Sequence, residues 1–241
     1  MFAGKRAARA LVAATLCLVL LGAFSATAVA ATDEGELVDV AKTVDDLQKK
    51  MDELRERGRN ANRGELSASA VCEEDEADPI FSAFGDAAFY TPAPGGDIEQ
   101  LEMWTVNKHT RRAENSPFGR GAASLFLGDH GEAISPAMCV SLAHPTIRLF
   151  AANTGGENSR LEVEILYEGL DGKIQKLKVA KLRGGAEWAP TSVVPVHVNM
   201  LGAAFDDGLT AIAVKFKAKD VKEKDAGWKI DDLYVDPMKV W

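Results

Sequence analysis

Turn residues divide the chain after Pro79 into short segments, and this punctuation constrains the fold more than any other feature. Clusters of Gly, Asn, Asp and Pro recur at intervals of roughly 10–15 residues, and β-branched and aromatic residues are frequent between them. The clearest strand pattern is 161–167, where apolar residues alternate with glutamates before an Asp171-Gly172 hairpin turn. No later segment carries a sustained helical stripe. We therefore predict an all-β fold for 79–241, an antiparallel β-sandwich of the jelly-roll type. The expected strands are 98–106, 124–127, 146–152, 161–167, 174–179, 193–198, 209–217 and 228–235.

The last expected strand, 228–235, carries two adjacent carboxylates at its centre. Side chains alternate across a strand, so Asp231 is expected to point the same way as Leu233, and Asp232 the same way as Tyr234. Whichever face is buried, one carboxylate then meets apolar surroundings. A buried carboxylate needs an ion pair, hydrogen bonds or a metal ion.

The N-terminus, residues 1–30, has the pattern of a secretory signal peptide. Three basic residues precede an apolar run from 10 to 24, and small residues follow up to Ala28-Val29-Ala30. The apolar run is shorter than the roughly 20 residues of a bilayer span, so we expect cleavage rather than an uncleaved membrane anchor. We predict a secreted, extracellular protein with no membrane span after signal cleavage.

The mature chain would be strongly acidic. Cleavage would leave 25 of the 28 basic residues against 36 acidic ones, a net charge of −11. Such a surface argues against nucleic acid and anionic lipid as partners.

Two cysteines, Cys72 and Cys139, would remain after Cys17 leaves with the signal peptide. In an exported chain a pair of cysteines indicates one disulfide. The alternatives are a cysteine-dependent enzyme or a cysteine metal site, but the sequence has no C-x-x-C and no His at ligand spacing.

Residues 31–59 carry a heptad pattern that predicts an amphipathic helix. The apolar positions, spaced by three and four residues, are Leu37, Val40, Val44, Leu47, Met51 and Leu54. In a parallel dimer the flanking positions would form no attractive ion pair, so the pattern leaves two readings open. One is a homo-oligomeric coiled coil through residues 33–59, and the other is a lone spacer helix. The polar segment 60–78 is expected to be a linker.

Two motifs near the ends of the predicted sandwich resemble those of galactose-binding-like and carbohydrate-binding-module jelly rolls. The first is Gly95-Gly96-Asp97-Ile98-Glu99 leading to Trp104, in which Ile98 replaces the Phe of that family. The second is the closing Trp228-x-Ile230-Asp231-Asp232-Leu233-x-Val235. The resemblance covers about residues 80–237, and it implies a non-catalytic module that binds a glycan of the cell envelope or surroundings.

The resemblance also implies a structural Ca²⁺ site between the first and last strands. Matched position by position, its ligands would be Glu99 and Asp231, with Asp97 as a further oxygen donor. The alternative is that no metal binds, and that Asp231 caps backbone N–H groups or pairs with Arg148 or Lys229.

Catalytic motifs are missing from the sequence. The four histidines are scattered, and no Gly-x-Ser-x-Gly, His-Glu-x-x-His or phosphate-binding glycine loop occurs. A pair of carboxylates of the glycosidase kind is not singled out either. We therefore predict that the protein is not an enzyme.

Aromatic side chains are the candidates for contacting a glycan, because their faces stack on sugars. We expect Trp188, Trp104 and Tyr90 to do so, with Trp188 favoured because glycines and Pro190 place it in a loop. A Trp in a small β-domain is more often in the core, which applies above all to Trp104. The competing function is a structural or interaction protein that oligomerises through its N-terminal helix and displays the β-domain.

Overall fold

The computed structural model of the chain describes residues 34–59, 64–73, 76–169, 171–204, 208–223 and 225–236. The predicted signal peptide lies outside the described residues. The chain divides into two units, Met1–Leu54 and Arg55–Trp241. Within the described ranges no helix is both long and apolar enough to cross a bilayer.

The heptad segment forms a helix, α2 (Glu34–Arg59), as its periodicity predicts. Gln48 donates a hydrogen bond to Asp52 one turn later, at 3.1 Å. Leu47, in the apolar stripe, is exposed. Whether the stripe pairs with a second copy stays a prediction.

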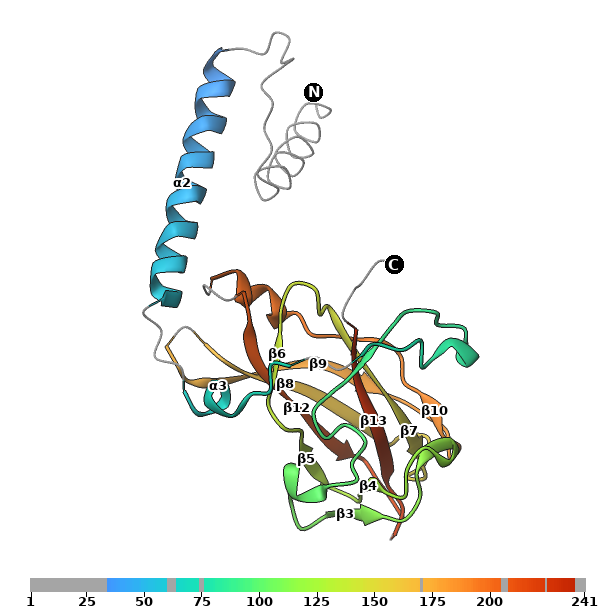
Figure 1. Cartoon of the computed structure of the whole chain (residues 1–241). Coiled ribbons are helices and arrows are strands. Elements are labelled where there is room, and N and C mark those ends of the chain that lie inside the picture. Colours follow the sequence, from blue (N-terminus) through green and yellow to red (C-terminus); the bar gives the residue numbers. More distant parts are fainter. Residues whose placement is uncertain are drawn as a thin grey trace. The chain divides into compact units, whose positions relative to one another are not determined.

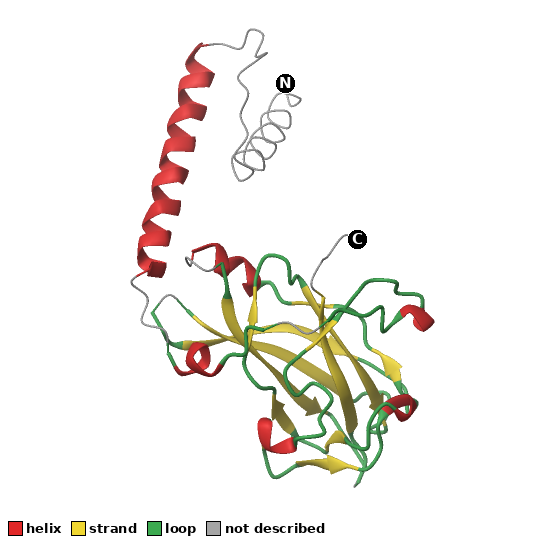
Figure 2. Cartoon of the chain, in the orientation of Figure 1, coloured by secondary structure: helices red, strands yellow, loops and turns green. Residues whose placement is uncertain are grey.

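The second unit is a β-sandwich of two antiparallel sheets (Figures 1 and 2). In the first sheet the strand order is β10 (Ala189–Pro190), β7 (Thr146–Asn153), β13 (Trp228–Asp236), β4 (Ser124–Leu127) and β3 (Thr110–Ala113). Two short strands join this sheet: β1 (Thr91–Pro92) on β13, and β11 (Val194–Pro195) on β7. In the second sheet the order is β2 (Thr105–Val106), β5 (Glu132–Ile134), β12 (Thr210–Lys219), β8 (Arg160–Glu168) and β9 (Ile174–Leu182), with β6 (Met138–Val140) on β12. The β-sandwich prediction is confirmed.

The two ends of the sandwich meet in the first sheet. Its first strand, β1, pairs with its last strand, β13, so that Thr91 lies opposite Val235. The loop that follows β1 also contacts β13, because Ala93 and Gly96 exchange backbone hydrogen bonds with Leu233. We call the side of each sheet that faces the other sheet its core face, and the opposite side its outer face.

One continuous apolar core fills the space between the core faces. Its largest fully buried side chains include Trp228, Phe216 and Ile165, from β13, β12 and β8. A second, smaller cluster lies on the outer face of the first sheet, where Phe81 and Tyr90 cover Phe150 and Tyr234. The chain segment before β1 therefore shields part of that outer face from water.

A β-bulge in β13 changes which residues face the core. The register with β7 shifts between Asp231 and Tyr234, and Asp232 has a positive φ of 51°. Because an extra residue is inserted, Leu233 packs in the main core while Tyr234 packs in the outer cluster. Strict alternation predicted that Asp231 shares a face with Leu233, and that prediction is wrong. Neither Asp231 nor Asp232 lies on the core face, where the side chains of this strand are apolar.

Of the other predicted strands, one hairpin is confirmed and two strands are shorter than predicted. The hairpin of β8 and β9 forms around Gly172 as predicted, with Leu161 opposite Leu182. The predicted strand 98–106 is wrong except at Thr105–Val106, because Ile98 has a left-handed φ of 57° and a 3-10 turn, η2 (Leu101–Met103), follows. The predicted strand 193–198 shortens to β11, where Pro195 has no N–H to continue the ladder.

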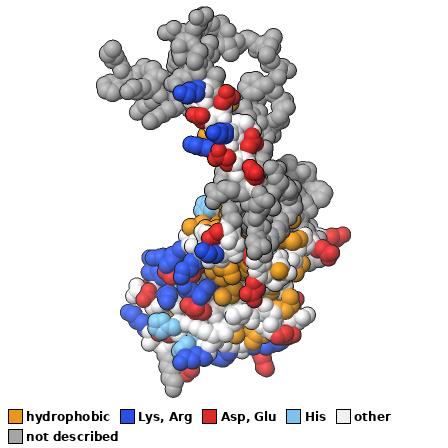
Figure 3. Space-filling model, turned by 90° about the vertical axis from the view of Figure 1, so that its left-hand side faces the viewer, with side chains coloured by type: hydrophobic (Ala, Val, Ile, Leu, Met, Phe, Trp, Pro, Cys, Tyr) orange, Lys and Arg blue, Asp and Glu red, His pale blue; other side chains and the backbone are white. Residues whose placement is uncertain are grey.

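The outer face of the second sheet carries rows of alternating charge. One row runs from Glu132 through Lys217 and Glu162 to Lys181, each on a neighbouring strand. Ion pairs link the strands, for example Lys178 to Glu162 at 2.8 Å. Basic side chains also gather on one side of the sandwich in Figure 3. Solvent-exposed ion pairs between neighbouring strands therefore explain the charge pattern of this face.

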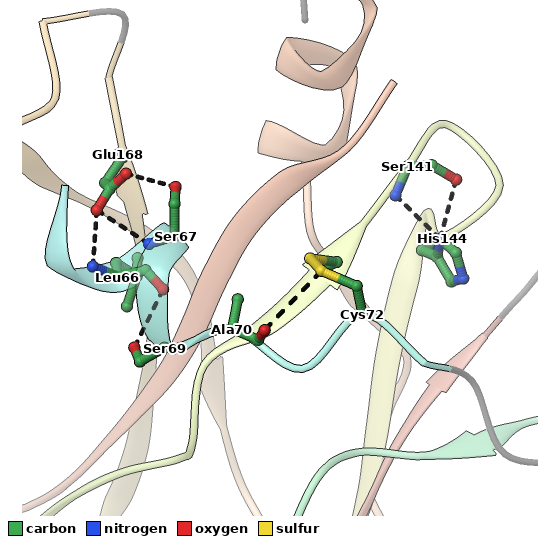
Figure 4. Close-up of a disulfide and its surroundings, with 9 residues drawn as sticks. Leu66, Ser67, Ser69, Ala70, Cys72, Ser141, His144 and Glu168 are labelled. Atoms are coloured by element: carbon green, nitrogen blue, oxygen red, sulfur yellow. Dashed lines mark hydrogen bonds between the residues drawn. A yellow bond between two sulfur atoms is a disulfide. The ribbon is translucent and has the colours of Figure 1, made fainter. Parts of the chain in front are cut away.

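The segment between the helix and the first strand is attached to the sandwich (Figure 4). Glu168 of β8 accepts hydrogen bonds from the backbone N–H groups of Gly64, Leu66 and Ser67 and from the Ser67 hydroxyl. These bonds hold the short helix α3 (Glu65–Ser69). Next along the chain, the predicted Cys72–Cys139 disulfide is present. Residues 64–72, within the segment expected to be a linker, thus contact the β-domain at two places.

Candidate functional site

A groove of about 900 Å³ lies over the outer face of the first sheet. Its floor is a row across three strands, in which Arg111 is opposite Phe126 and Phe126 is opposite Lys229. These side chains point outward because their neighbours Leu125 and Leu127 fill the core. The groove is lined by Arg111, Arg112, Ala113, Glu114, Asn115, Phe126, Thr154, Glu223, Asp225, Ala226 and Lys229.

The lining is polar and its formal charges balance. Three basic side chains (Arg111, Arg112, Lys229) face three acidic ones (Glu114, Glu223, Asp225). The guanidinium of Arg111 lies over the Phe126 ring, with Cζ 4.3 Å from the ring centroid. Phe126 is itself 8% exposed, so the groove offers mainly polar groups, and these supply both hydrogen-bond donors and acceptors. Such a lining suits an uncharged ligand rich in hydroxyl groups.

Trp188 lies at the rim of this groove. Its indole Nε1 donates a hydrogen bond to Asn115 Oδ1 at 2.6 Å, and Asn115 lines the groove. The ring packs on the outer aromatic cluster and stays partly exposed. Its position is compatible with the expected role in ligand contact, which stays a prediction.

The structure places the other two aromatic candidates away from solvent. Trp104 is buried against Phe216, with ring centroids 6.3 Å apart, and its Nε1 donates to Gly95 O at 2.8 Å. Tyr90 is buried in the outer cluster, and its hydroxyl donates to Asp86 at 2.7 Å. Neither ring presents a face to a ligand, because core neighbours already cover both.

Sequence reasoning missed the residues that form the groove floor. Arg111, Phe126 and Lys229 are far apart in the chain, and only strand pairing brings them into one row. Their separate positions carry no local motif.

The acidic pair of β13 is buried outside the main core. Asp231 is 1% exposed and Asp232 is 8% exposed. Burial and the neighbouring carboxylate of Asp232 raise the pKa of Asp231 to about 8. Its Oδ1 accepts the backbone N–H of Asp232 at 2.8 Å, and Ser116 donates to the same carboxylate.

The carboxylate of Asp232 has fewer hydrogen bonds than that of Asp231. Burial raises its pKa, and the positive charge of Arg120 opposes that rise. The Arg120 Nε lies 3.3 Å from Asp232 Oδ2 but without hydrogen-bond geometry, so this buried oxygen has no hydrogen-bond partner. The expected alternative partners of Asp231 are engaged elsewhere: Arg148 pairs with Asp86, and Lys229 lines the groove.

The expected calcium ligands were tested against this arrangement. Glu99 lies close enough to Asp231 to raise its pKa electrostatically, but its Oε1 accepts the N–H groups of Ala122 and Ala123 at 2.7 and 3.0 Å. Its Oε2 pairs with Arg112 at 3.4 Å. Among the residues that the structure describes, no group of three or more His, Cys, Asp or Glu side chains is placed to hold a metal ion. The trio Glu99, Asp231 and Asp97 does not fit Ca²⁺ unless Glu99 gives up these bonds, and the site stays a prediction.

One Ser–His contact has the distance of a catalytic pair, but it belongs to a turn. Ser141 Oγ lies 3.0 Å from His144 Nδ1, and the same nitrogen accepts the backbone N–H of Ser141 (Figure 4). The hydroxyl also accepts the N–H of Ala143 at 3.1 Å. The contact therefore closes a local loop around buried His144.

No family model and no curated protein sequence matches the chain. Solved structures similar to it include several carbohydrate-binding modules. One is the CBM22-1 xylan-binding domain of Paenibacillus barcinonensis Xyn10C, with TM-score 0.39, 12% identity, and coverage of 57% of this chain and 87% of that one. The C-terminal CBM6 of a Zobellia galactanivorans laminarinase has TM-score 0.36, 12% identity and coverage of 55% and 90%. TmCBM61 in complex with β-1,4-galactotriose has TM-score 0.32, 14% identity and coverage of 58% and 90%. These TM-scores are too low to carry an argument, so the β-sandwich assignment is based on the strand pairing itself.

Proposed function

We propose that the β-sandwich is a non-catalytic glycan-binding module whose ligand lies in the groove over the first sheet. The observation that carries the proposal is the composition of the groove, in which balanced charges and Asn115 surround the Arg111 guanidinium that lies over Phe126. Planar Arg, Asn and carboxylate groups hydrogen-bond to hydroxyls, and the partly exposed ring of Trp188 at the rim can stack on the C–H face of a sugar. A neutral glycan uses both features.

The charge balance argues against other ligand classes. A polyanion would require a clear excess of basic side chains, and Glu114, Glu223 and Asp225 remove that excess. A purely apolar ligand would leave the charged lining without partners. The groove is therefore matched to a polar ligand without net charge.

The test is direct binding by titration calorimetry with residues 31–241. The probes are neutral oligosaccharides, xylohexaose, cellotetraose and β-1,4-galactotriose, with a wider oligosaccharide array behind them. We expect Asn115→Ala to weaken binding by roughly tenfold, because one hydrogen bond and the support of Trp188 are lost. Lys173→Ala, at an exposed turn of the other sheet, is the matched control and should bind normally. Absence of binding across the array would refute the proposal.

Export is part of this proposal. The signal-peptide pattern of residues 1–30 and the Cys72–Cys139 disulfide both suit an oxidising, extracellular location. Expression with the native N-terminus in a secreting host should yield a protein in the medium that begins near residue 31. A cell-retained chain that keeps residue 1 would contradict it.

The proposal also includes Ca²⁺ binding at the acidic pair, Asp231 and Asp232. The support for it is the buried Asp232 Oδ2 without a hydrogen-bond partner, next to the carboxylate of Asp231. These hard oxygens are donors that Ca²⁺ accepts, and Glu99 would complete them after releasing Ala122 and Ala123. The ion would add to the positive charge that Arg120 already brings to Asp232.

The second candidate function is homo-oligomerisation through residues 33–59. The observation that favours it is the exposed Leu47 in the apolar stripe of a helix that forms. Light scattering on residues 31–241 and 64–241 would test it. We expect a concentration-dependent oligomer only with the longer chain, and a monomer at all concentrations would exclude it.

A further inference from the structure

Two exposed phenylalanines stand on the same outer face as the groove. Phe84 is 44% exposed and Phe118 is 58% exposed, and their ring centroids are 5.5 Å apart. Both rings also contact Phe150 of β7, at 5.7 and 5.3 Å. We call Phe84 and Phe118 the phenylalanine platform. Because Phe150 supports both rings, the platform is fixed over the sheet while its upper side is open to solvent.

The backbone at Phe118 is held in a costly conformation. Its φ of 54° and ψ of 24° are left-handed, within the turn η3 (Pro117–Gly119). A non-glycine residue in this region costs about 1 kcal/mol or more, and a bulky one is rare there. In this conformation the Phe118 ring is mostly exposed to solvent, so the strained backbone does not place an apolar side chain in the core. Strain of this kind is a reason to look for a ligand.

The platform lies close to the groove on the same face of the sheet. Phe150 lies opposite Asp231, two residues from the groove residue Lys229, so the two outward rows are about 7 Å apart. Along the chain, Phe118 follows the groove residue Asn115 by three positions, and Asn115 holds the ring of Trp188. Trp188 thus contacts the groove through Asn115 and packs on the outer cluster, to which Phe150 belongs.

Polar groups border the platform. Arg120, two residues after Phe118, keeps a partly exposed guanidinium that donates to the Tyr234 hydroxyl at 3.1 Å. A guanidinium has five N–H donors, more than its contacts with Tyr234 and Asp232 use. Aromatic faces edged by hydrogen-bond donors match the alternating apolar and polar faces of a sugar ring.

We propose that the ligand is an extended oligosaccharide whose chain continues from the groove past Asn115 and stacks on Phe84 and Phe118. This inference rests on the proposed glycan-binding function and specifies its ligand as a chain longer than the groove alone can hold. A short oligosaccharide fills the groove and leaves the platform bare. Affinity therefore rises with chain length until the platform is covered.

The test measures dissociation constants by calorimetry for the dimer and the hexamer of each sugar series that binds residues 31–241. Phe118→Gly removes the ring and also relieves the left-handed backbone, so its melting temperature should not fall. Phe84→Ala is the second variant. Each should weaken hexamer binding by roughly tenfold and leave dimer binding unchanged. Phe118→Trp should retain the preference for the hexamer, and Ile174→Ala, an exposed apolar residue on the other sheet, is the control.

The outcomes separate the two proposals. Equal hexamer affinity in wild type, Phe118→Gly and Phe84→Ala would overturn the platform, and the groove would keep its function if Asn115→Ala still weakened binding. If the phenylalanine variants lost the same affinity for the dimer as for the hexamer, the platform proposal would also be overturned. The substitutions would then disturb the groove itself and not a contact made only by a longer chain. If wild type binds no oligosaccharide at all, the glycan function and the platform are refuted together.

Discussion

The buried acidic pair predicts an unusual dependence of stability on pH. Asp231 has an ordinary carboxyl pKa near 3.8 when unfolded and about 8 when folded. Between these values the folded state keeps a proton that the unfolded state has lost. The free energy of unfolding therefore falls as pH rises, by up to about 1.4 kcal/mol per pH unit.

Over the whole window the loss amounts to at most roughly 6 kcal/mol, from a typical domain stability of about 5–15 kcal/mol. Other carboxyl groups act at a different pH. The pKa values of Asp86, Glu132, Glu162 and Glu168 are lowered, so their contributions are lost only as pH falls through the acid range. Those four carboxyl groups therefore contribute little to a change of stability between pH 5 and 8, and the comparison with Asp231→Asn separates the acidic pair from the histidines that titrate there.

The assay is urea unfolding of residues 31–241 at several pH values in EDTA. Asp231→Asn keeps an oxygen that accepts the Asp232 N–H and removes the titrating group, so the variant should show a flatter profile and exceed wild type at pH 8. Glu102→Gln, at an exposed position, should follow wild type. A wild-type profile that is flat or rises with pH in EDTA would refute the reasoning.

Repeating the series in excess calcium tests the ion separately. Bound Ca²⁺ would replace the proton on the pair, so stability at pH 8 should increase in wild type and not in Asp231→Asn. If calcium changes neither, the proposed metal site is wrong while the proton linkage can still hold.

Three further predictions concern the joints of the sandwich. Glu168→Gln should destabilise the protein by about 1–3 kcal/mol in urea unfolding, since the charged acceptor of four hydrogen bonds is lost, and wild-type stability would contradict this role. Burial by itself would raise the pKa of Glu168, but the bonds from Ser67, Gly64 and Leu66 lower it, so Glu168→Gln should also lose part of the decline in stability below pH 4. Replacing Cys72 and Cys139 by Ser should cost about 4 kcal/mol for a loop of 67 residues, and an unchanged melting temperature would contradict it. Gly96→Ala should lower the melting temperature, because its Cβ would collide with the Leu233 carbonyl oxygen where the two ends meet, whereas Gly185→Ala has open space and should not.

The parts of this fold that could be predicted are those specified by neighbouring residues in the sequence. The β8–β9 hairpin follows from alternation and a glycine with φ of 72°, and the helix α2 follows from its heptads. The disulfide followed from the number of cysteines left for an exported chain. The segment 98–106 failed, because Ile98 becomes buried by leaving extended geometry, and no local signal marks that choice.

The candidate site depended much less on local pattern. Trp188 was expected at a surface because its neighbours indicated a loop, and it lies at the groove rim. Trp104 and Tyr90 looked equivalent as aromatic residues, but packing against other strands buries them. Phe118 carries no motif, and its significance becomes visible only from its exposed ring and its positive φ.

Alone, the amino-acid sequence determined the class of the protein: an acidic chain with an export pattern, a heptad helix and turn-punctuated strands that form a sandwich. Turn residues and alternation act over a few neighbouring positions, so they can be read without coordinates. The tertiary structure decided which face each residue occupies. A bulge at Asp231–Tyr234 took Asp232 off the core face and put Leu233 there, and strand pairing assembled the groove from β3, β4 and β13. Register is settled by long-range packing, because a shift of one residue exchanges every side chain between core and solvent.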